Sequence, residues 1–212
     1  LGGGDDGDDS GNQDQKKEDV RIEYPDAVTW EVYTLEGLYM WADEVRSNTT
    51  SMRINLKLFA DIYMEEPWTP LGYVRGSIDG QGYTIHNLTI EQTTSYAGFL
   101  SEMGDDAEVG NLNFANVKIT GQYYVGAIAG SSTGVISNCK VLSGSVTGTG
   151  ENVGGMVGLS GYYLKFYDCE NYATVSVCKS FSATMWLFHK KASSISIMKG
   201  LAVISTRLVV GL

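Results

Sequence analysis

The apolar side chains between residues 76 and 90 follow an unusual rhythm. In this stretch, GSIDGQGYTIHNLTI, the apolar positions Tyr83, Ile85, Leu88 and Ile90 are reached in steps of two, three and two residues. A single strand would step by two throughout, and a helix would step by three and four. The rhythm therefore predicts short strands with one inward face, joined by corners at which two polar residues are skipped.

The same rhythm recurs farther along the chain. It returns at Val109, Leu112, Phe114, Val117 and Ile119, and again at Ile136, Cys139, Val141, Gly144 and Val146. Glycine-containing segments also begin at positions 96, 124 and 152, which gives a period of 28 residues. A fixed period of this kind is typical of stacked repeats. Residues 72–177 are therefore predicted to form a mainly β, parallel β-solenoid, with neighbouring strands about 4.8 Å apart and glycines that permit positive φ at the corners.

A helical pattern precedes the repeats. Within residues 34–48 the apolar side chains fall on one helical face, namely Leu35, Leu38, Tyr39, Ala42 and Val45. Thr34 is the expected N-cap, and residues 52–58 alternate as a half-buried strand. An amphipathic helix at this place is expected to cap the exposed end of the first coil, with Leu38 buried near Ile78 and Ile85.

Composition and charge divide the rest of the chain. The 212 residues include 43% apolar residues, enough for the core of one domain or a small pair. Residues 1–27 are acidic and rich in glycine and aspartate at their start, so a disordered tether is predicted there, followed by an N-terminal cap over 28–71. The net charge of −10 argues against a nucleic-acid partner. No stretch has the roughly 18–20 apolar residues of a membrane span.

Residues 178–212 depart from the pattern. From position 171 to the end the sequence contains no Asp or Glu. The segment SSISIMK at 193–199 nevertheless resembles GVISNCK at 134–140. A degenerate final repeat or an out-of-frame tail is favoured for 178–212, and a hydrophobic C-terminal cap is the alternative.

These motifs resemble a known family. WTPLG at 68–72, the stretch at 76–90, and the elements YAGFL with GNLNFANVKITG and YVGAIAG with GVISNCKVLSGSVTG are similar to GLUG-motif repeats. The resemblance covers residues 30–177 and includes the order of the elements. GLUG repeats occur in bacterial surface proteins and in the non-catalytic region of IgA-specific metallopeptidases. The resemblance thus implies a right-handed parallel β-helix in a secreted or surface-anchored protein.

The resemblance also implies an anchor and a turn. The opening of the chain looks like the segment that follows the lipidated cysteine of Gram-negative surface lipoproteins, which implies a lipid anchor in the outer membrane. The family supplies no catalytic residues. Within IDGQG, Asp79 is expected to hydrogen-bond the backbone of the following turn, and Gly80 and Gly82 to supply unusual torsions.

The sequence offers few groups for catalysis or metal binding. It has two histidines, His86 and His189, of which His86 is expected to be solvated at a corner. No HExxH, GxSxG or P-loop motif is present, and no cofactor is predicted. Residues 102–108 lack the spacing of a known calcium loop. Six carboxylates could form a glycosidase pair, although solvated loop acids are favoured: Asp61, Glu65, Glu66, Asp79, Asp105 and Asp106.

Two further residue types point to the surface and the core. Cys139 and Cys169 occupy equivalent repeat positions, where two buried thiols are favoured over a disulfide. Tyrosines occur in pairs, and exposed aromatic rings on a solenoid could bind a sugar ring or a protein. The candidate ligand-binding residues are therefore Tyr123, Tyr124, Tyr162 and Tyr163. The alternative is that one tyrosine of each pair packs and the other lies on the surface.

Two classes of function fit these patterns. The first is a non-enzymatic surface or secreted β-helix for adhesion, scaffolding, or binding of a glycan or protein. The second is an enzyme that acts on polysaccharides, because parallel β-helices also serve lyases and hydrolases of acidic glycans. Residues 72–170 contain few basic side chains, which argues against polyanionic substrates. The first class is favoured.

Overall fold

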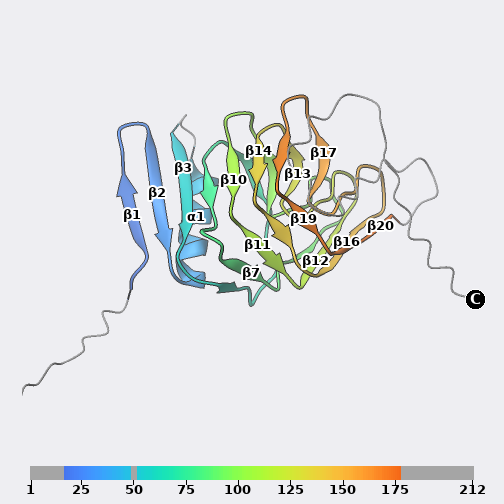
Figure 1. The fold of residues 1–212 in the computed structure, drawn as a ribbon, viewed down its shortest axis with the longest axis horizontal. Helices are drawn as coiled ribbons and strands as arrows, with labels where there is room; N and C mark the ends of the chain where they lie inside the picture. The colour runs from blue at the N-terminus through green and yellow to red at the C-terminus, as the bar shows by residue number, and fades with distance from the viewer. Residues whose placement is uncertain (1–16, 49–51, 178–212) are drawn as a thin grey trace, which may run out of the picture.

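The computed structural model describes residues 17–48 and 52–177. These residues wind into a parallel β-solenoid whose strands lie in four sheets (Figure 1). Sheet A has the order β1-β2-β3-β6-β10-β14-β18, sheet B β19-β15-β11-β7-β4, sheet C β17-β13-β9-β5, and sheet D β20-β16-β12-β8. The predicted mainly β solenoid is confirmed.

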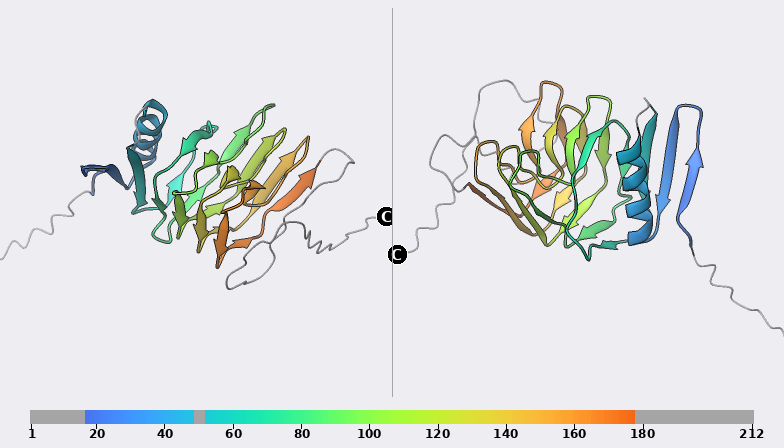
Figure 2. Two further views of the ribbon diagram at one scale, coloured as in Figure 1. Left: turned by 90° about the horizontal axis from the view of Figure 1, so that it is seen from above. Right: turned by 180° about the vertical axis from the view of Figure 1, so that it is seen from behind.

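Each complete coil contributes one strand to each sheet. The first coil has β5 (Leu71–Val74), β6 (Ile78–Asp79), β7 (Thr84–His86) and β8 (Thr89–Glu91). The second has β9 (Leu100–Met103), β10 (Glu108–Gly110), β11 (Asn113–Ala115) and β12 (Val117–Gly121). The third has β13 (Ala129–Ser132), β14 (Val135–Ser137), β15 (Lys140–Val141) and β16 (Gly144–Gly148). The fourth has β17 (Val157–Ser160), β18 (Lys165–Tyr167), β19 (Glu170–Asn171) and β20 (Thr174–Val177). The coils lie side by side along the long axis (Figure 2).

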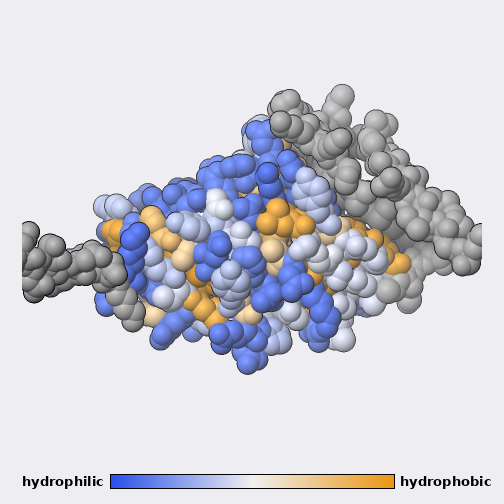
Figure 3. Space-filling model, turned by 60° about the horizontal axis from the view of Figure 1, so that its bottom comes forward, coloured by the Kyte–Doolittle hydropathy of each residue, from blue (hydrophilic) through white to orange (hydrophobic). Residues whose placement is uncertain are grey.

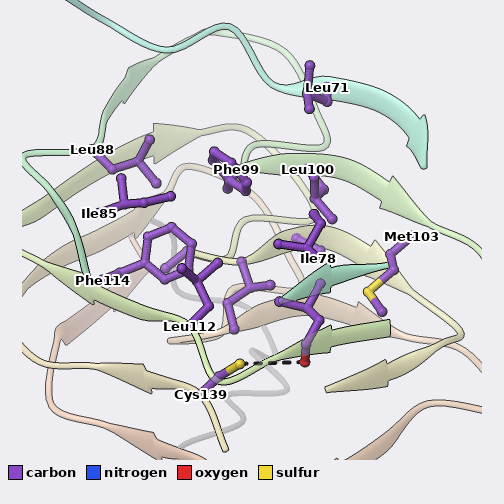
Figure 4. Close-up of a cluster of buried hydrophobic side chains, with 14 of the residues drawn as sticks. Leu71, Ile78, Ile85, Leu88, Phe99, Leu100, Met103, Leu112, Phe114 and Cys139 are labelled. Carbon is purple, nitrogen blue, oxygen red and sulfur yellow. Dashed lines mark hydrogen bonds between the residues drawn. The ribbon is translucent and has the colours of Figure 1, made fainter. Parts of the chain in front are cut away.

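The apolar rhythm of the sequence corresponds to the inward-facing ladders. Ile90, Ile119 and Val146 are paired in register on successive strands of sheet D, and all three are buried. Figure 4 shows such side chains filling the interior, among them Ile85 and Phe114 from sheet B. The second residue of a skipped pair turns the corner, since Asn87 has φ +60° and Asn116 has φ +54°, whereas His86 and Ala115 end their strands. The interpretation of the two-residue steps as strands and of the three-residue steps as corners is thus confirmed.

The corners use asparagine more than glycine, which differs from the prediction. Among the described residues, nine non-glycine residues have positive φ, against two glycines, Gly82 and Gly144. Asparagine tolerates the left-handed region, and its amide can also bond to the next coil. Asn138 Nδ2 donates to Asn111 Oδ1 over 2.8 Å, and Asn111 Nδ2 donates to Asp79 Oδ1 over 3.0 Å. Side-chain ladders therefore hold the corners together.

Glycine is required where two coils approach closely. A Cβ at Gly126 would lie 2.7 Å from the carbonyl oxygen of Met156, and one at Gly130 would lie 2.6 Å from the Cα of Tyr96. The predicted turn at IDGQG also contains one glycine needed for close packing, Gly80, and one with positive φ, Gly82. Gln81 N donates to Asp79 Oδ1 over 3.0 Å as expected, but Gly80 serves close packing and not positive φ.

The N-terminal end is closed by α1 (Leu35–Ser47), which lies between β2 (Ala27–Val32) and β3 (Arg53–Leu58) in the chain. Thr34 Oγ1 accepts a hydrogen bond from Gly37 N over 3.0 Å, so Thr34 is the N-cap. The helix packs against β2, β3 and β5. Leu38 is fully buried as predicted, but the main contacts of the helix are with these strands and not with β6 and β7, which carry Ile78 and Ile85.

Aromatic rings join the helix to the first complete coils. The ring centroids of Trp41 and Phe99 are 6.0 Å apart, and those of Trp68 and Phe99 are 4.9 Å apart, both stacked. Trp68 Nε1 donates to the Phe99 carbonyl oxygen over 2.8 Å. Phe99 in turn meets Phe114 edge to face at 5.6 Å. One aromatic cluster therefore ties the cap to the core.

Several segment boundaries differ from those predicted. β1 (Val20–Glu23) lies inside the predicted tether and pairs antiparallel with β2 at the edge of sheet A. β4 (Ile62–Tyr63) pairs with β7, so sheet B begins inside the predicted cap of 28–71. The residues of β1 alternate between apolar and polar, but four residues are too few to predict a strand, and pairing with β2 defines it. The remainder of the predicted tether, residues 1–16, and the predicted tail, 178–212, lie outside the described residues. Within the described part, α1 is not long and apolar enough to cross a membrane.

We expect Trp41→Ala to destabilise the protein by about 3–5 kcal/mol, because it removes a fully buried indole and its stack on Phe99. Urea unfolding followed by circular dichroism measures the change. The control Met40→Ala alters a half-exposed neighbour on the same helix and should cost less than about 0.5 kcal/mol. Equal stability of Trp41→Ala and the parent would show that the helix does not close the core.

Glu44 should make stability depend on pH. Arg21 Nη2 donates to Glu44 Oε1 over 2.9 Å and Trp30 Nε1 to Oε2 over 2.6 Å, which joins β1, β2 and α1. The hydrogen bond from Arg21 lowers the pKa of Glu44; burial opposes it, and the bond from Trp30 adds to it. A carboxyl with a depressed folded-state pKa contributes stability above its unfolded pKa and loses it as the pH falls through the folded value.

Glu44→Gln should therefore lower the free energy of unfolding at pH 7 by about 1 kcal/mol and make little difference once both states protonate this carboxyl in acid. Urea titrations of parent and variant across the acidic range give the comparison. Glu36→Gln, on the exposed side of α1, serves as control. A Glu44→Gln deficit that stays constant down to the lowest pH would contradict the assigned role of the carboxylate.

Candidate binding surface

Three of the six carboxylates considered for catalysis support the fold, and the other three, Glu65, Glu66 and Asp105, are exposed. Asp106 Oδ2 accepts hydrogen bonds from Arg75 over 3.0 Å and from Arg53 over 3.3 Å, and the bond from Arg75 lowers the pKa of Asp106. Asp61 Oδ1 accepts from Thr84 N over 2.8 Å. Asp79 holds the IDGQG turn. Within the described ranges, no three side chains of His, Cys, Asp or Glu gather as a metal site would need.

The two predicted thiols lie in register on successive coils. Cys139 and Cys169 precede the paired residues Lys140 and Glu170. Both are free thiols; Cys139 is buried and Cys169 is half-buried. A hydrogen bond with Cys169, together with burial, raises the pKa of the Cys139 thiol, and the same bond lowers the pKa of Cys169.

The four predicted tyrosines do not form one ladder. Tyr123 and Tyr124 lie at the corner between β12 and β13, where the Tyr124 ring packs 4.7 Å from that of Tyr96 on the previous coil. Tyr123 is 40% exposed. Tyr162 and Tyr163 lie in the turn between β17 and β18 and are both exposed. The two pairs thus sit at different corners of the coil. The first pair follows the alternative in which one ring packs and the other lies on the surface.

The outward face of sheet B carries a row that the sequence reading missed. We call it the sheet B stripe, and its members are Tyr63, His86 and Ala115 at the ends of β4, β7 and β11, and Leu142 and Tyr172 directly after β15 and β19. Each follows an inward-facing residue on its strand, and the register of β4, β7, β11, β15 and β19 aligns them. Tyr63, Leu142 and Tyr172 are 58%, 42% and 55% exposed. In the sequence, each of these residues directly follows an inward-facing position, which could have marked it as outward-facing. Only the strand register shows that the five residues are neighbours.

Two rings of the stripe are stacked on each other. The ring centroids of Tyr63 and His86 are 4.3 Å apart, and the ring planes differ by 4°. His86 Nε2 lies 3.9 Å from Asp61 Oδ2. His86 was expected to be a solvated corner residue; instead it lies in β7, half-buried and stacked.

A polar row runs beside the stripe on the same face. We call it the sheet B polar row, and it comprises Asp61, Thr84, Asn113, Lys140 and Glu170. Lys140 Nζ lies 3.8 Å from Glu170 Oε1, and the Tyr172 hydroxyl donates to Glu170 Oε2 over 2.6 Å. Figure 3 shows the underside of the molecule, where several small apolar areas lie among polar residues. The face therefore presents apolar and aromatic side chains beside neutral polar groups, the carboxylate of Asp61 and the ion pair of Lys140 and Glu170.

The outward face of sheet D has a different character. Its two rows are Thr89, Lys118, Ser145 and Thr174, and Glu91, Thr120, Thr147 and Ser176. Lys118 and Glu91 form an ion pair. This face presents hydroxyl groups but no aromatic ring.

A cavity of about 470 Å³ lies at the end of α1, lined in part by Arg46, Tyr73 and Arg75. Its guanidinium groups already have partners. Arg46 lies 2.9 Å from Asp43 and Arg75 lies 3.0 Å from Asp106. Asn48 and Met52, at the edges of the described ranges, also line this cavity. We therefore treat the outer face of sheet B as the candidate binding surface.

Comparison with known proteins gives two similarities. No family model matches the chain. The chain is 33% identical over 134 residues to halomucin of Haloquadratum walsbyi, and this match covers 54% of the chain and 1% of halomucin. The crystal structure of a "putative immunoglobulin A1 protease" from Bacteroides ovatus has a TM-score of 0.40 and 13% identity, covering 82% of this chain and 81% of that one. That likeness is loose, and the description of the fold rests on the strand register.

The thiol pair should react in a fixed order. In a Cys178→Ser background, we expect a thiol reagent to modify Cys169 before Cys139, because Cys169 is more exposed and its pKa is lowered. Mass spectrometry of timed digests gives the order. Cys169→Ser should leave Cys139 as a slow thiol. Faster labelling of Cys139 in the folded protein would contradict its position inside the solenoid.

Proposed function

We propose that this chain is a non-enzymatic binding module of a secreted or cell-surface protein. One observation carries the proposal: the stacked coils align outward-facing residues of sheet B into one row, the sheet B stripe. Three of its five members, Tyr63, Leu142 and Tyr172, are exposed. A stiff scaffold with a regular outward face suits recognition, because its side chains are held in place before a ligand arrives. The candidate partner is an extracellular glycan or protein, and nucleic acid is disfavoured by the charge of −10.

The roles of the acidic residues support binding over catalysis. Glycoside cleavage needs two carboxyl groups that face each other across a substrate, at about 5–9.5 Å. Asp79 and Asp106 instead serve a turn and an arginine pair, and Asp61 bonds the backbone of β7. These carboxylates contribute to the fold.

The extracellular assignment rests on sequence likeness. The resemblance to GLUG-motif repeats favours a surface protein, and the match to a segment of halomucin agrees with a repeat used within a larger protein. The chain spans only 1% of halomucin, so the activity of a whole protein does not transfer. We include in the proposal a lipid anchor in the outer membrane of a Gram-negative bacterium, on the resemblance of the opening segment alone.

A panel of immobilised glycans and extracellular proteins tests this function, read both for bound protein and for released products. We expect saturable binding to at least one ligand class and no products. New reducing ends or unsaturated sugars would replace the proposal with a polysaccharide-active enzyme. Tyr123→Ala and Tyr163→Ala report whether the tyrosine pairs contribute to the binding.

A further inference from the structure

Two thiols lie at the same corner of successive coils, near the end of the described solenoid. Each directly precedes a strand, Cys139 before β15 and Cys169 before β19, and these two strands are paired in register. Glu170 N donates to the Cys139 carbonyl oxygen over 3.0 Å, so the two cysteines lie on directly adjacent coils. At a strand spacing of about 4.8 Å, their Cα atoms fall within the range of about 4.4–6.8 Å that a disulfide spans.

The Cys169 side chain is turned toward the coil of Cys139. Cys169 Sγ lies 3.5 Å from the carbonyl oxygen of Ile136, which belongs to the third coil. Cys139 Sγ makes the equivalent contact one coil earlier, 3.5 Å from the Val109 carbonyl oxygen. A disulfide therefore requires the Cys139 side chain to turn back toward Cys169, which gives up only the weak hydrogen bonds of a thiol.

The two thiols differ in the way that a reactive pair requires. Cys169 is half-buried and belongs to the last described coil, whereas Cys139 is fully buried. The hydrogen bond between them lowers the pKa of Cys169 and raises the pKa of Cys139. The thiolate is the attacking species in thiol–disulfide exchange, and cysteines that respond to oxidants are accessible thiols of low pKa beside a second cysteine.

We propose that Cys139 and Cys169 form a reversible oxidation site whose disulfide cross-links the fourth coil to the third. The oxidant is a small disulfide of the glutathione class, in the oxidising surroundings of a secreted or surface protein. The Cys169 thiolate attacks one sulfur of the oxidant, forms a mixed disulfide and releases one thiolate. The Cys139 thiol then loses its proton, attacks Cys169 Sγ and releases the second thiolate. The two cysteines together lose two electrons and two protons, and the oxidant becomes two thiols.

The cross-link acts at the end of the solenoid that has the fewest partners. Within the described residues, each of the strands β17–β20 is paired on one side only. Phe166 of β18 is 7% exposed, whereas its partner Ile136 on β14 is fully buried. The fourth coil is therefore expected to open before the others. A disulfide to the third coil opposes this opening, because it restricts the freed chain.

The test uses the full chain in a Cys178→Ser background, in which these two thiols are the only ones. The folded protein is equilibrated with oxidised glutathione, its remaining thiols are alkylated, and it is digested with trypsin without reduction. Trypsin places Cys139 and Cys169 on separate peptides, residues 119–140 and 166–179. We expect mass spectrometry to find these two peptides joined by a disulfide in most molecules, and dithiothreitol to separate them.

Single-thiol variants in the same background are the matched controls. With Cys139→Ser, Cys169 should retain glutathione as a mixed disulfide, because no second thiol displaces it. With Cys169→Ser, Cys139 should take up glutathione at least about tenfold more slowly, because it is buried. A lasting glutathione adduct on Cys169 in the two-thiol protein, cross-links between molecules only, or equal rates in the two variants would overturn the proposal.

Limited proteolysis measures the effect on the fourth coil. On reducing gels, oxidation should slow chymotrypsin cleavage within residues 157–177 by about tenfold or more, and dithiothreitol should restore the faster rate. Neither single-thiol variant should gain this protection. Equal cleavage of the oxidised and reduced two-thiol proteins would overturn the structural role of the cross-link. None of these measurements involves the sheet B stripe, so their failure leaves the proposed binding function in place.

Discussion

The structure depends on in-register stacking of one coil on the next. Because each strand pairs with its equivalent on the neighbouring coil, every residue meets its counterpart about 4.8 Å away. Inward counterparts such as Ile90, Ile119 and Val146 form the dry core. Corner counterparts are joined as well, as where the Asn138 amide donates a hydrogen bond to Asn111 Oδ1. The same constraint that builds the interior therefore also orders the surface, and the sheet B stripe is a consequence of it.

Stacking leaves open ends, and the N-terminal end is closed in two ways. The edge of sheet A is continued by β3 and β2 and finished by β1, a short antiparallel strand with charged side chains, which discourages pairing with another chain. The interior is closed by α1, whose Trp41 stacks on Phe99. The contact of Arg21 with Glu44 fastens the edge strand to the helix, so that edge and interior are closed by one connected unit.

Under the proposed function, the outward rows give the scaffold a binding surface without a deep pocket. A residue that differs in size from its neighbours in a row changes the height of the surface over about one strand spacing. In the sheet B stripe, the stacked rings of Tyr63 and His86 stand next to the small side chain of Ala115. Affinity in such a module comes from several modest contacts in a row.

The strands, corners, helix and turn could be predicted from residues that are close together in the chain. The two-and-three rhythm predicted strands and corners, Thr34 and the apolar face of residues 34–48 predicted the helix, and Asp79 predicted its turn, because each depends on residues close together in the chain. Which residues of different coils become neighbours in space could be seen only in the folded protein. Tyr124 and Tyr163 lie more than one 28-residue period apart and fall at different corners, while Tyr63 and His86 become stacked neighbours. Register depends on the summed lengths of the corners and on pairing between strands, and no local pattern encodes that sum.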